Sequence, residues 1–267
     1  MLYITGTPIG NLEDITLRQL RILGEVDLIA AEDTRHSLKL LTYYNIKTKF
    51  VSYHANSSYE KTLHLLQILE EGKQIALITD CGMPLISDPG SKLVNLAYEK
   101  GIKVTTVPGP TAFVSGLVLS TLSTSKFIFE GFFPVKKHSV LINSLKTETR
   151  TVCFYEAPHR LIKTLNILKE LGDRKISIIR EITKLYEEAL LFSSAEEAIL
   201  HFNINKPKGE FVIVIEGRET ESIFNNTLED HVEELIFEGY SKKDAIKQVA
   251  KLRSLPKSEV YKYINIL

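Results

Sequence analysis

Residues 75–90, IALITDCGMPLISDPG, decide the fold class of this chain. The first four, 75–78, are apolar without alternation, which is typical of a strand in the middle of a parallel sheet covered on both faces. A loop rich in Gly, Pro and Asp follows at once. Ligands of open α/β sheets bind beyond the carboxyl ends of such strands, so this loop is a candidate ligand site. Taken alone, the stretch is equally compatible with an ordinary Gly/Pro-rich turn.

Apolar runs of strand length alternate with helical patterns on both sides of this stretch. The predicted strands are residues 2–5, 26–31, 50–54, 75–78 and 104–107, and then 127–132, 151–155, 175–180 and 210–215. A Ser/Thr-rich segment, 119–126, has the composition of a link between the two groups. The sequence therefore predicts an α/β fold with two consecutive α/β units, 1–120 and 121–219, whose sheets are mainly parallel.

The last segment, 220–267, changes in character. Residues 221–240 hold six acidic side chains and no Lys or Arg, whereas residues 241–267 hold seven basic side chains against two acidic ones. Ser241 is a suitable N-cap, and a stripe of apolar residues predicts a helix after it: Ala245, Ile246, Val249, Ala250 and Leu252. A break at 254–256 precedes a second helix with Val260, Tyr261 and Ile264. This outline favours a helix-turn-helix that presents cations to phosphates, although a packing hairpin with a solvated basic face fits equally well.

The composition excludes several classes of protein. The chain has 267 residues, 44% hydrophobic and 25% charged, which is ordinary for a globular protein. Lys+Arg and Asp+Glu both number 33, so a polyanionic partner needs a local basic patch. Cys81 and Cys153 form no CxxC or Cys/His pattern, which indicates reduced thiols in a cytoplasm and no metal site. We expect a cytoplasmic protein, because no signal-peptide pattern or membrane-length apolar run is present.

The loop after the first predicted strand, GTPIGN at 6–11, argues against a dinucleotide-binding fold. A GxGxxG fingerprint would open a helix here, and a proline interrupts it instead.

Eight segments, taken in order, resemble the motifs of the tetrapyrrole methylase superfamily, and most closely those of its ribosomal branch, the small-subunit ribosomal RNA methyltransferases I. They are residues 5–12, 31–35, 78–90, 107–112, 129–134, 155–160, 180–188 and 209–217. Tetrapyrrole enzymes usually carry Gly-Asp-Pro in the central loop. This chain has Gly82-Met83-Pro84 there, which argues against a tetrapyrrole substrate.

The resemblance implies 2′-O-methylation of a cytidine ribose in small-subunit (16S) ribosomal RNA, with S-adenosyl-L-methionine as the cofactor. It implies a homodimer, a partner that is ribosomal RNA or the small ribosomal subunit, and no membrane. The cofactor would lie in a cleft between the two α/β units, against residues at the matching positions: Pro8, Cys81, Gly82, Met83, Ile86, Thr111, Ala112, Glu156 and Ala157. Two alternatives stay open, a methylase of a tetrapyrrole or other small molecule and a non-enzymatic RNA-binding assembly factor.

A ribose hydroxyl is a weak nucleophile, so a positioned base would help the transfer. The candidates are Glu32, Asp33, Asp80, Asp88, Glu156, His159, Glu181 and Glu210. We single out Asp33 with Arg35, and Glu156 with His159, because both pairs follow predicted strands. A structural ion pair is the alternative for the first pair, and a helix-start cap for the second.

Cations at the ends of predicted strands and in the tail are the expected RNA contacts, because phosphate contacts position a nucleic acid. They are Arg35, Arg160, Lys184, Lys242, Lys243 and Lys247. Residues 136–138 form a further predicted basic loop.

Overall fold

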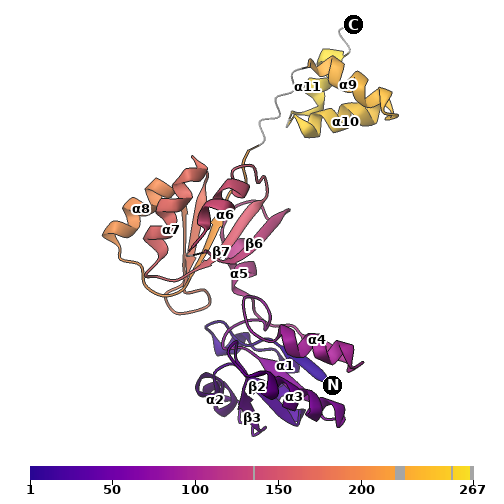
Figure 1. Cartoon of the computed structure of the whole chain (residues 1–267). Coiled ribbons are helices and arrows are strands. Elements are labelled where there is room, and N and C mark those ends of the chain that lie inside the picture. The colour runs from indigo at the N-terminus through magenta and orange to yellow at the C-terminus, as the bar shows by residue number, and fades with distance from the viewer. Residues whose placement is uncertain (135, 220–225, 254, 265–267) are drawn as a thin grey trace. The chain divides into compact units, whose positions relative to one another are not determined.

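Five parallel strands form the first sheet, in the order β3-β2-β4-β1-β5. They are β1 (Leu2–Thr5), β2 (Leu28–Ala31), β3 (Phe50–Ser52), β4 (Ile75–Ile78) and β5 (Val104–Val107). The sheet belongs to a computed structural model that describes residues 1–134, 136–219, 226–253 and 255–264. The chain divides into two compact units, Met1–Arg218 and Glu219–Leu267, and both five-stranded sheets lie in the first unit (Figure 1).

Helices cover both faces of the first sheet. Leu2, Ile4 and Leu77 point into a core shared with α3 (Tyr59–Glu70) and α4 (Ser91–Glu99). Ile29 and Ile78 point into a second core, shared with α1 (Leu17–Glu25) and α2 (Thr34–Tyr43). A strand that is buried on both faces has no polar side to show, so the unbroken apolar run in β4 has its explanation here.

The second sheet has the order β6-β7-β10-β8-β9 and a different pairing. Its strands are β6 (Phe127–Phe132), β7 (Thr151–Glu156), β8 (Ile176–Arg180), β9 (Glu188–Phe192) and β10 (Phe211–Ile215). The α/β class is confirmed, and so is parallel pairing in the first sheet. In the second sheet only β6 and β7 are parallel, and the other three pairings are antiparallel. The expectation of a mainly parallel sheet is therefore wrong for this half of the chain.

The reversal starts at the loop between β8 and β9. No helix separates these two strands, and a connection this short joins antiparallel neighbours only. The sequence analysis did not predict β9, whose burial alternates along its length as expected for an edge strand.

Alternate residues of the second sheet enter different cores. Val152 and Phe154 pack with α7 (Leu161–Leu168) and α8 (Ala195–Ile204), while Cys153 faces α5 (Ala112–Leu119) on the other side. Helix α6 (His138–Leu145) lies on the same side as α7 and α8. A Cβ atom at Gly116 of α5 would lie 2.7 Å from Cγ1 of Val212, so α5 packs this closely on β10 because residue 116 has no side chain.

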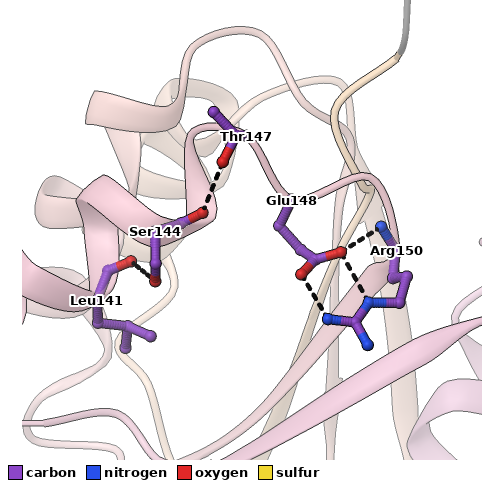
Figure 2. A network of polar contacts seen from close by, with 5 residues as sticks. All are labelled: Leu141, Ser144, Thr147, Glu148 and Arg150. Atoms are coloured by element: carbon purple, nitrogen blue, oxygen red, sulfur yellow. Dashed lines mark hydrogen bonds and ion pairs between the residues drawn. The ribbon is translucent and has the colours of Figure 1, made fainter.

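A polar network at the end of α6 fixes the point where the first unit ends. The Glu148 carboxylate accepts hydrogen bonds from the backbone N–H of Arg150, at 2.9 Å, and from Nε and Nη2 of its guanidinium, at 2.8 and 2.7 Å (Figure 2). This pairing holds the pKa of Glu148 at about 2. The Glu148 carbonyl accepts from the N–H of Arg218, the last residue of the unit.

The second unit consists, in its described part, of three helices, α9 (Leu228–Phe237), α10 (Lys242–Leu252) and α11 (Lys257–Ile264). Their core contains Val232, Val249 and Val260. The two helices expected after residue 240 are present, and Ser241 caps α10 as predicted. Leu252, which the sequence predicts in the apolar stripe, is 46% exposed.

Some of the sequence-based expectations fall on residues that the structure does not describe. Ser254, in the predicted break, and Glu221, in the acidic stretch, lie outside the described residues. The basic loop predicted at 136–138 ends early, because α6 begins at His138. Within the described part of the chain, no helix combines the length and the hydropathy needed to cross a membrane.

Candidate active site

Three loops at the carboxyl ends of β1, β4 and β5 pack tightly against one another. Thr7 and Gly82 exchange backbone hydrogen bonds of 2.8 and 3.1 Å, and the Thr7 hydroxyl donates to the Thr79 carbonyl at 3.1 Å. A Cβ atom at Gly6 would lie 2.9 Å from Cα of Gly109. The loops can approach this closely because both positions are glycine.

A cleft of about 490 Å³ opens beside these loops, and both sheets contribute to its walls. The first sheet supplies Ile9, Glu32, residues 79–83, Ile86, Ser87, Asp88, Thr111 and Ala112. The second supplies Phe132, residues 155–158, Ile182, Lys184 and residues 210–212. The cleft lies where parallel α/β sheets bind ligands, beyond the strand ends.

The structure brings eight of the nine predicted cofactor residues together in this cleft. Those lining it are Cys81, Gly82, Met83, Ile86, Thr111, Ala112, Glu156 and Ala157. Pro8 is buried beside Ile9, which does line the cleft. Their contacts with a cofactor stay a prediction.

The lining has three features that suit S-adenosylmethionine: open backbone, apolar surface and negative charge. Gly82 has φ +84°, and a Cβ added there would meet nothing nearer than Ile9 Cγ2 at 3.5 Å, so a ligand can approach the backbone. Ile86, Ala112 and Phe132 give apolar surface for an adenosyl or methionine chain. The ionisable lining is mostly acidic, with Glu32, Asp80, Asp88, Glu156 and Glu210 against Lys184, which favours a cationic sulfonium ligand.

Asp33 and Arg35 lie outside the cleft lining and bind each other. The Asp33 carboxylate caps α2 by accepting from the Arg35 N–H at 2.8 Å, and it accepts from Arg35 Nη2 at 2.8 Å. These bonds lower the pKa of Asp33 to about 2. The Arg35 side chain is 89% exposed. A carboxylate with such low proton affinity is a weak base, which favours the structural ion pair at this position.

Glu156 is a buried anchor. Its side chain is fully buried, and it accepts hydrogen bonds from the Ala157 N–H at 2.7 Å, from Arg160 Nε at 2.7 Å and from the Thr164 hydroxyl. With its oxygens occupied in this way, the carboxylate is poorly placed to accept a substrate proton. His159, expected to act beside it, is exposed and lies outside the residues that line the cleft among those described.

Lys184 is the lysine of the cleft wall, and two carboxylates hold it. Its Nζ lies 2.9 Å from Glu181 Oε1 and 2.8 Å from Glu210 Oε2. These bonds raise the pKa of Lys184 against an opposing effect of burial, and the pKa of Glu181 is lowered. Glu181 is thus committed to Lys184 rather than available as a base.

Two carboxylates of the loop after β4 have a different environment. Burial raises the pKa of Asp80, whose Oδ1 accepts from the Asp33 N–H at 3.1 Å. Burial and the nearby Glu32 charge raise the pKa of Asp88 to about 6. Burial also raises the pKa of Cys81 to about 11, so this thiol is neutral at physiological pH. The cleft therefore contains acidic groups that lose their protons at a higher pH than usual.

Sequence reasoning missed several lining residues that stand directly beside the recognised motifs. These are Ile9, Thr79, Ser87, Phe132, Tyr155, Pro158, Ile182, Phe211 and Val212. The sequence did contain a signal for them, because each of these residues lies within one of the eight segments that resemble the family's motifs.

Of the predicted RNA contacts, Arg160 is held by Glu156 and Lys184 by its two carboxylates, while Arg35 is exposed. Lys242, Lys243 and Lys247 are exposed on α10 of the second unit.

Comparison with known proteins assigns the family. Residues 1–199 match the tetrapyrrole (corrin/porphyrin) methylases. A ribosomal RNA small subunit methyltransferase I of Thermotoga maritima is 49% identical over 220 residues, which are 82% of this chain and 99% of that protein. Its namesake in Halalkalibacterium halodurans is 45% identical over 97% of this chain and 93% of its own length.

A solved structure supports the fold. It is the uroporphyrin-III C-methyl transferase of Thermus thermophilus complexed with S-adenyl homocysteine, with a TM-score of 0.56, 20% sequence identity, and coverage of 80% of this chain and 96% of that one. The match over residues 1–199 and the identity to the two curated relatives go further than fold. The chain is a methyltransferase that belongs to the tetrapyrrole methylase family and, within it, to the ribosomal RNA small subunit methyltransferases I.

Proposed function

We propose that this protein transfers a methyl group from S-adenosylmethionine to the 2′ hydroxyl of a cytidine in small-subunit ribosomal RNA, in the cytoplasm. The observation that carries the proposal is the 45% identity, over nearly the whole chain, to a relative named for methylation of this RNA. An acidic, partly apolar cleft at the matching strand ends supports it.

The cleft residues divide the work between holding the cofactor and placing the acceptor. S-adenosylmethionine, when bound, supplies an electrophilic methyl group on a sulfonium sulfur. Backbone groups of residues 81–83 and 111–112 would hold it, with apolar contact from Ile86 and Phe132. Alignment of donor and acceptor supplies much of the acceleration in such a displacement.

The second unit is proposed to bind RNA through α10. Lys243, Lys247 and Lys251 are exposed and follow each other at a spacing of four residues, so they share one face of the helix. The Thermotoga relative matches 82% of this chain over almost all of its own length, and residues 1–218 make up the same share. This agreement supports a tail that adds RNA affinity to a methyltransferase unit already complete without it.

A homodimer is proposed on the surface of α5. One face of this helix packs on the second sheet through Gly116 and Leu117, yet Val114 and Val118 on the other side are exposed. A helix that is apolar all round is normally buried on all sides. A second copy of the chain is the occupant that we propose for this face.

The alternatives are less well supported. A tetrapyrrole substrate disagrees with Met83 in the central loop and with the names of the relatives. An assembly factor without activity would bind RNA independently of the cofactor.

The test is methyl transfer from labelled S-adenosylmethionine to small ribosomal subunits from cells that lack this protein, followed by nucleoside analysis. We expect labelled 2′-O-methylcytidine. Cofactor binding without label in the RNA would redirect the assignment to a small-molecule or protein substrate. RNA binding without any cofactor binding would favour the assembly factor.

A further inference from the structure

We propose that Asp88 is the residue that takes the proton from the acceptor hydroxyl during methyl transfer. The inference rests on the proposed function and adds to it the identity of the base, which the sequence left open among eight residues.

Asp88 lies where an acceptor held between the two sheets would reach it. Asp88 lines the cleft at the end of the loop that follows β4, and its charge raises the pKa values of Cys81 on the same loop and of Tyr155 on β7. It therefore acts on groups of both sheets. An acceptor bound between the sheets would meet it.

The backbone before Asp88 adopts an unusual conformation. Leu85 and Ser87 both have left-handed conformations, with φ +75° and +65°, which are rare for residues other than Gly, Asn and Asp. A Cβ atom at Gly131 of β6 would lie 3.2 Å from the Ser87 hydroxyl oxygen, so the loop is packed against the second sheet. Strained backbone of this kind is kept where it positions a functional group.

Asp88 also differs from the other candidates in its hydrogen bonding. The Thr79 hydroxyl beside it donates its single proton to Glu32 Oε2, so it cannot donate to Asp88 at the same time. In contrast, Asp33, Glu156 and Glu181 each bind a cation. Asp80 has a backbone donor of its own.

The surrounding charges act in the same direction. The groups that face Asp88 are Glu32 after β2, Asp80 and Cys81 after β4, and Tyr155 on β7; Lys184 and Glu210 line the same cleft and bind each other. Burial, then Glu32, then Asp80 raise the pKa of Asp88 to about 6. A base whose pKa lies near the working pH combines ionisation with proton affinity.

The proton balance is simple. As the acceptor oxygen forms its bond to the methyl carbon, the O–H bond breaks and its proton goes to a carboxylate oxygen of Asp88, while the electron pair of the broken C–S bond stays on sulfur. Asp88 then releases the proton to water, and no oxidant, reductant or metal takes part.

The experiment compares Asp88→Asn with Asp80→Asn, and with Asp173→Asn, which makes the same chemical change at an exposed site away from the cleft. We expect kcat to fall by about 10²–10⁴-fold in Asp88→Asn, with a much smaller change in cofactor affinity because the other four carboxylates of the lining remain. The wild-type rate should rise about tenfold per pH unit below pH 6 and level off above it, and Asp88→Asn should lose this rise. Asp173→Asn should keep both rate and profile.

A readout without turnover completes the test. In the cofactor-free protein labelled with ¹³C at the Asp carboxyl groups, the resonance missing from Asp88→Asn should titrate near pH 6. A midpoint near 4, or loss of the rise in Asp80→Asn while Asp88→Asn retains it, would overturn the proposal. If the wild-type protein methylates no RNA, the proposed function fails; if it does and Asp88→Asn is equally fast, only the role of Asp88 fails.

Discussion

Glu156 shows how a residue at a strand end can serve the site without touching the chemistry. It is the last residue of a buried strand and lines the cleft, which is the pattern expected of a catalytic carboxylate. Its oxygens, however, bind Arg160, Thr164 and its own chain. Its role is to fix the turn from β7 into α7, and through that turn the second wall of the cleft.

Replacing this buried carboxylate should be costly. In Glu156→Ala, Arg160 keeps its charge in a mostly buried place with no counter-charge, and breaking such a pair costs about 3–5 kcal/mol of unfolding free energy. The matched control is Glu25→Ala, because Arg21 and Glu25 form an Arg–Glu pair at the same spacing of four residues but are more than half exposed. That change should cost less than about 1 kcal/mol. Urea unfolding measures both, and equal losses would contradict the role assigned to Glu156.

Sequence reasoning located the cleft residues better than it assigned their roles. Cys81, Met83 and Thr111 could be placed in the cleft through the family resemblance, and the structure brings them together because they follow strands whose ends meet at one edge of a parallel sheet. Roles depend on side-chain partners that are distant in sequence. Nothing near Asp33 in the sequence reveals that its N–H binds Asp80, 47 residues away.

At the scale of elements, the prediction succeeded where helices separate strands and failed where they do not. The five strands of the first sheet follow from apolar runs between helical patterns. Strand β9 and the antiparallel pairing of β8 and β10 did not, because the residues of a strand do not encode its direction. The short loop after β8 carried the only local sign of a reversal.

Helix α5 carries the element-scale prediction. Val118 is 71% exposed on the face of α5 that points away from the second sheet. If a second copy covers this face, Val118→Glu places a charge in an apolar interface and should convert the dimer to a monomer, as measured by sedimentation velocity. The control is Leu200→Glu. Leu200 is 67% exposed and belongs to α8, the helix that packs on the opposite face of the same sheet. A wild-type protein that sediments as a monomer, or a Val118→Glu variant that stays dimeric, would contradict the proposed interface.

At the scale of the whole molecule, the chain divides after residue 218 into two units, to which we assign different proposed roles, methyl transfer and RNA binding. The first unit holds the cleft with its acidic lining. The second has its own apolar core, and Arg253 stabilises it by donating to His231 and to Asn226. Lysines on α10 that make no comparable contact in the described residues remain exposed to solvent. Residues 219–267 hold seven basic and nine acidic side chains, and all seven basic ones lie after residue 240. The proposed RNA contacts therefore depend on this basic segment and not on the charge of the whole unit.

Reversing three of these charges should therefore weaken RNA binding without affecting the cofactor site. We expect the Lys242→Glu, Lys243→Glu, Lys247→Glu variant to lose RNA affinity at low salt, and its plot of log affinity against log salt to become shallower by roughly two to three units, because each lost phosphate contact removes about 0.7–0.9 from the slope. Folding should be kept, since Lys242 and Lys243 lie in the first turn of α10, where acidic residues are favourable, and Lys247 is exposed. The charge-matched control, Lys163→Glu, Lys169→Glu, Lys206→Glu, changes exposed lysines of the first unit and should bind RNA nearly as the wild type does. The measurement is filter binding to RNA, with S-adenosylmethionine affinity measured in parallel. Unchanged RNA affinity in the α10 variant would show that the tail is not part of the binding surface. A parallel loss of cofactor affinity would show that the two units do not act independently.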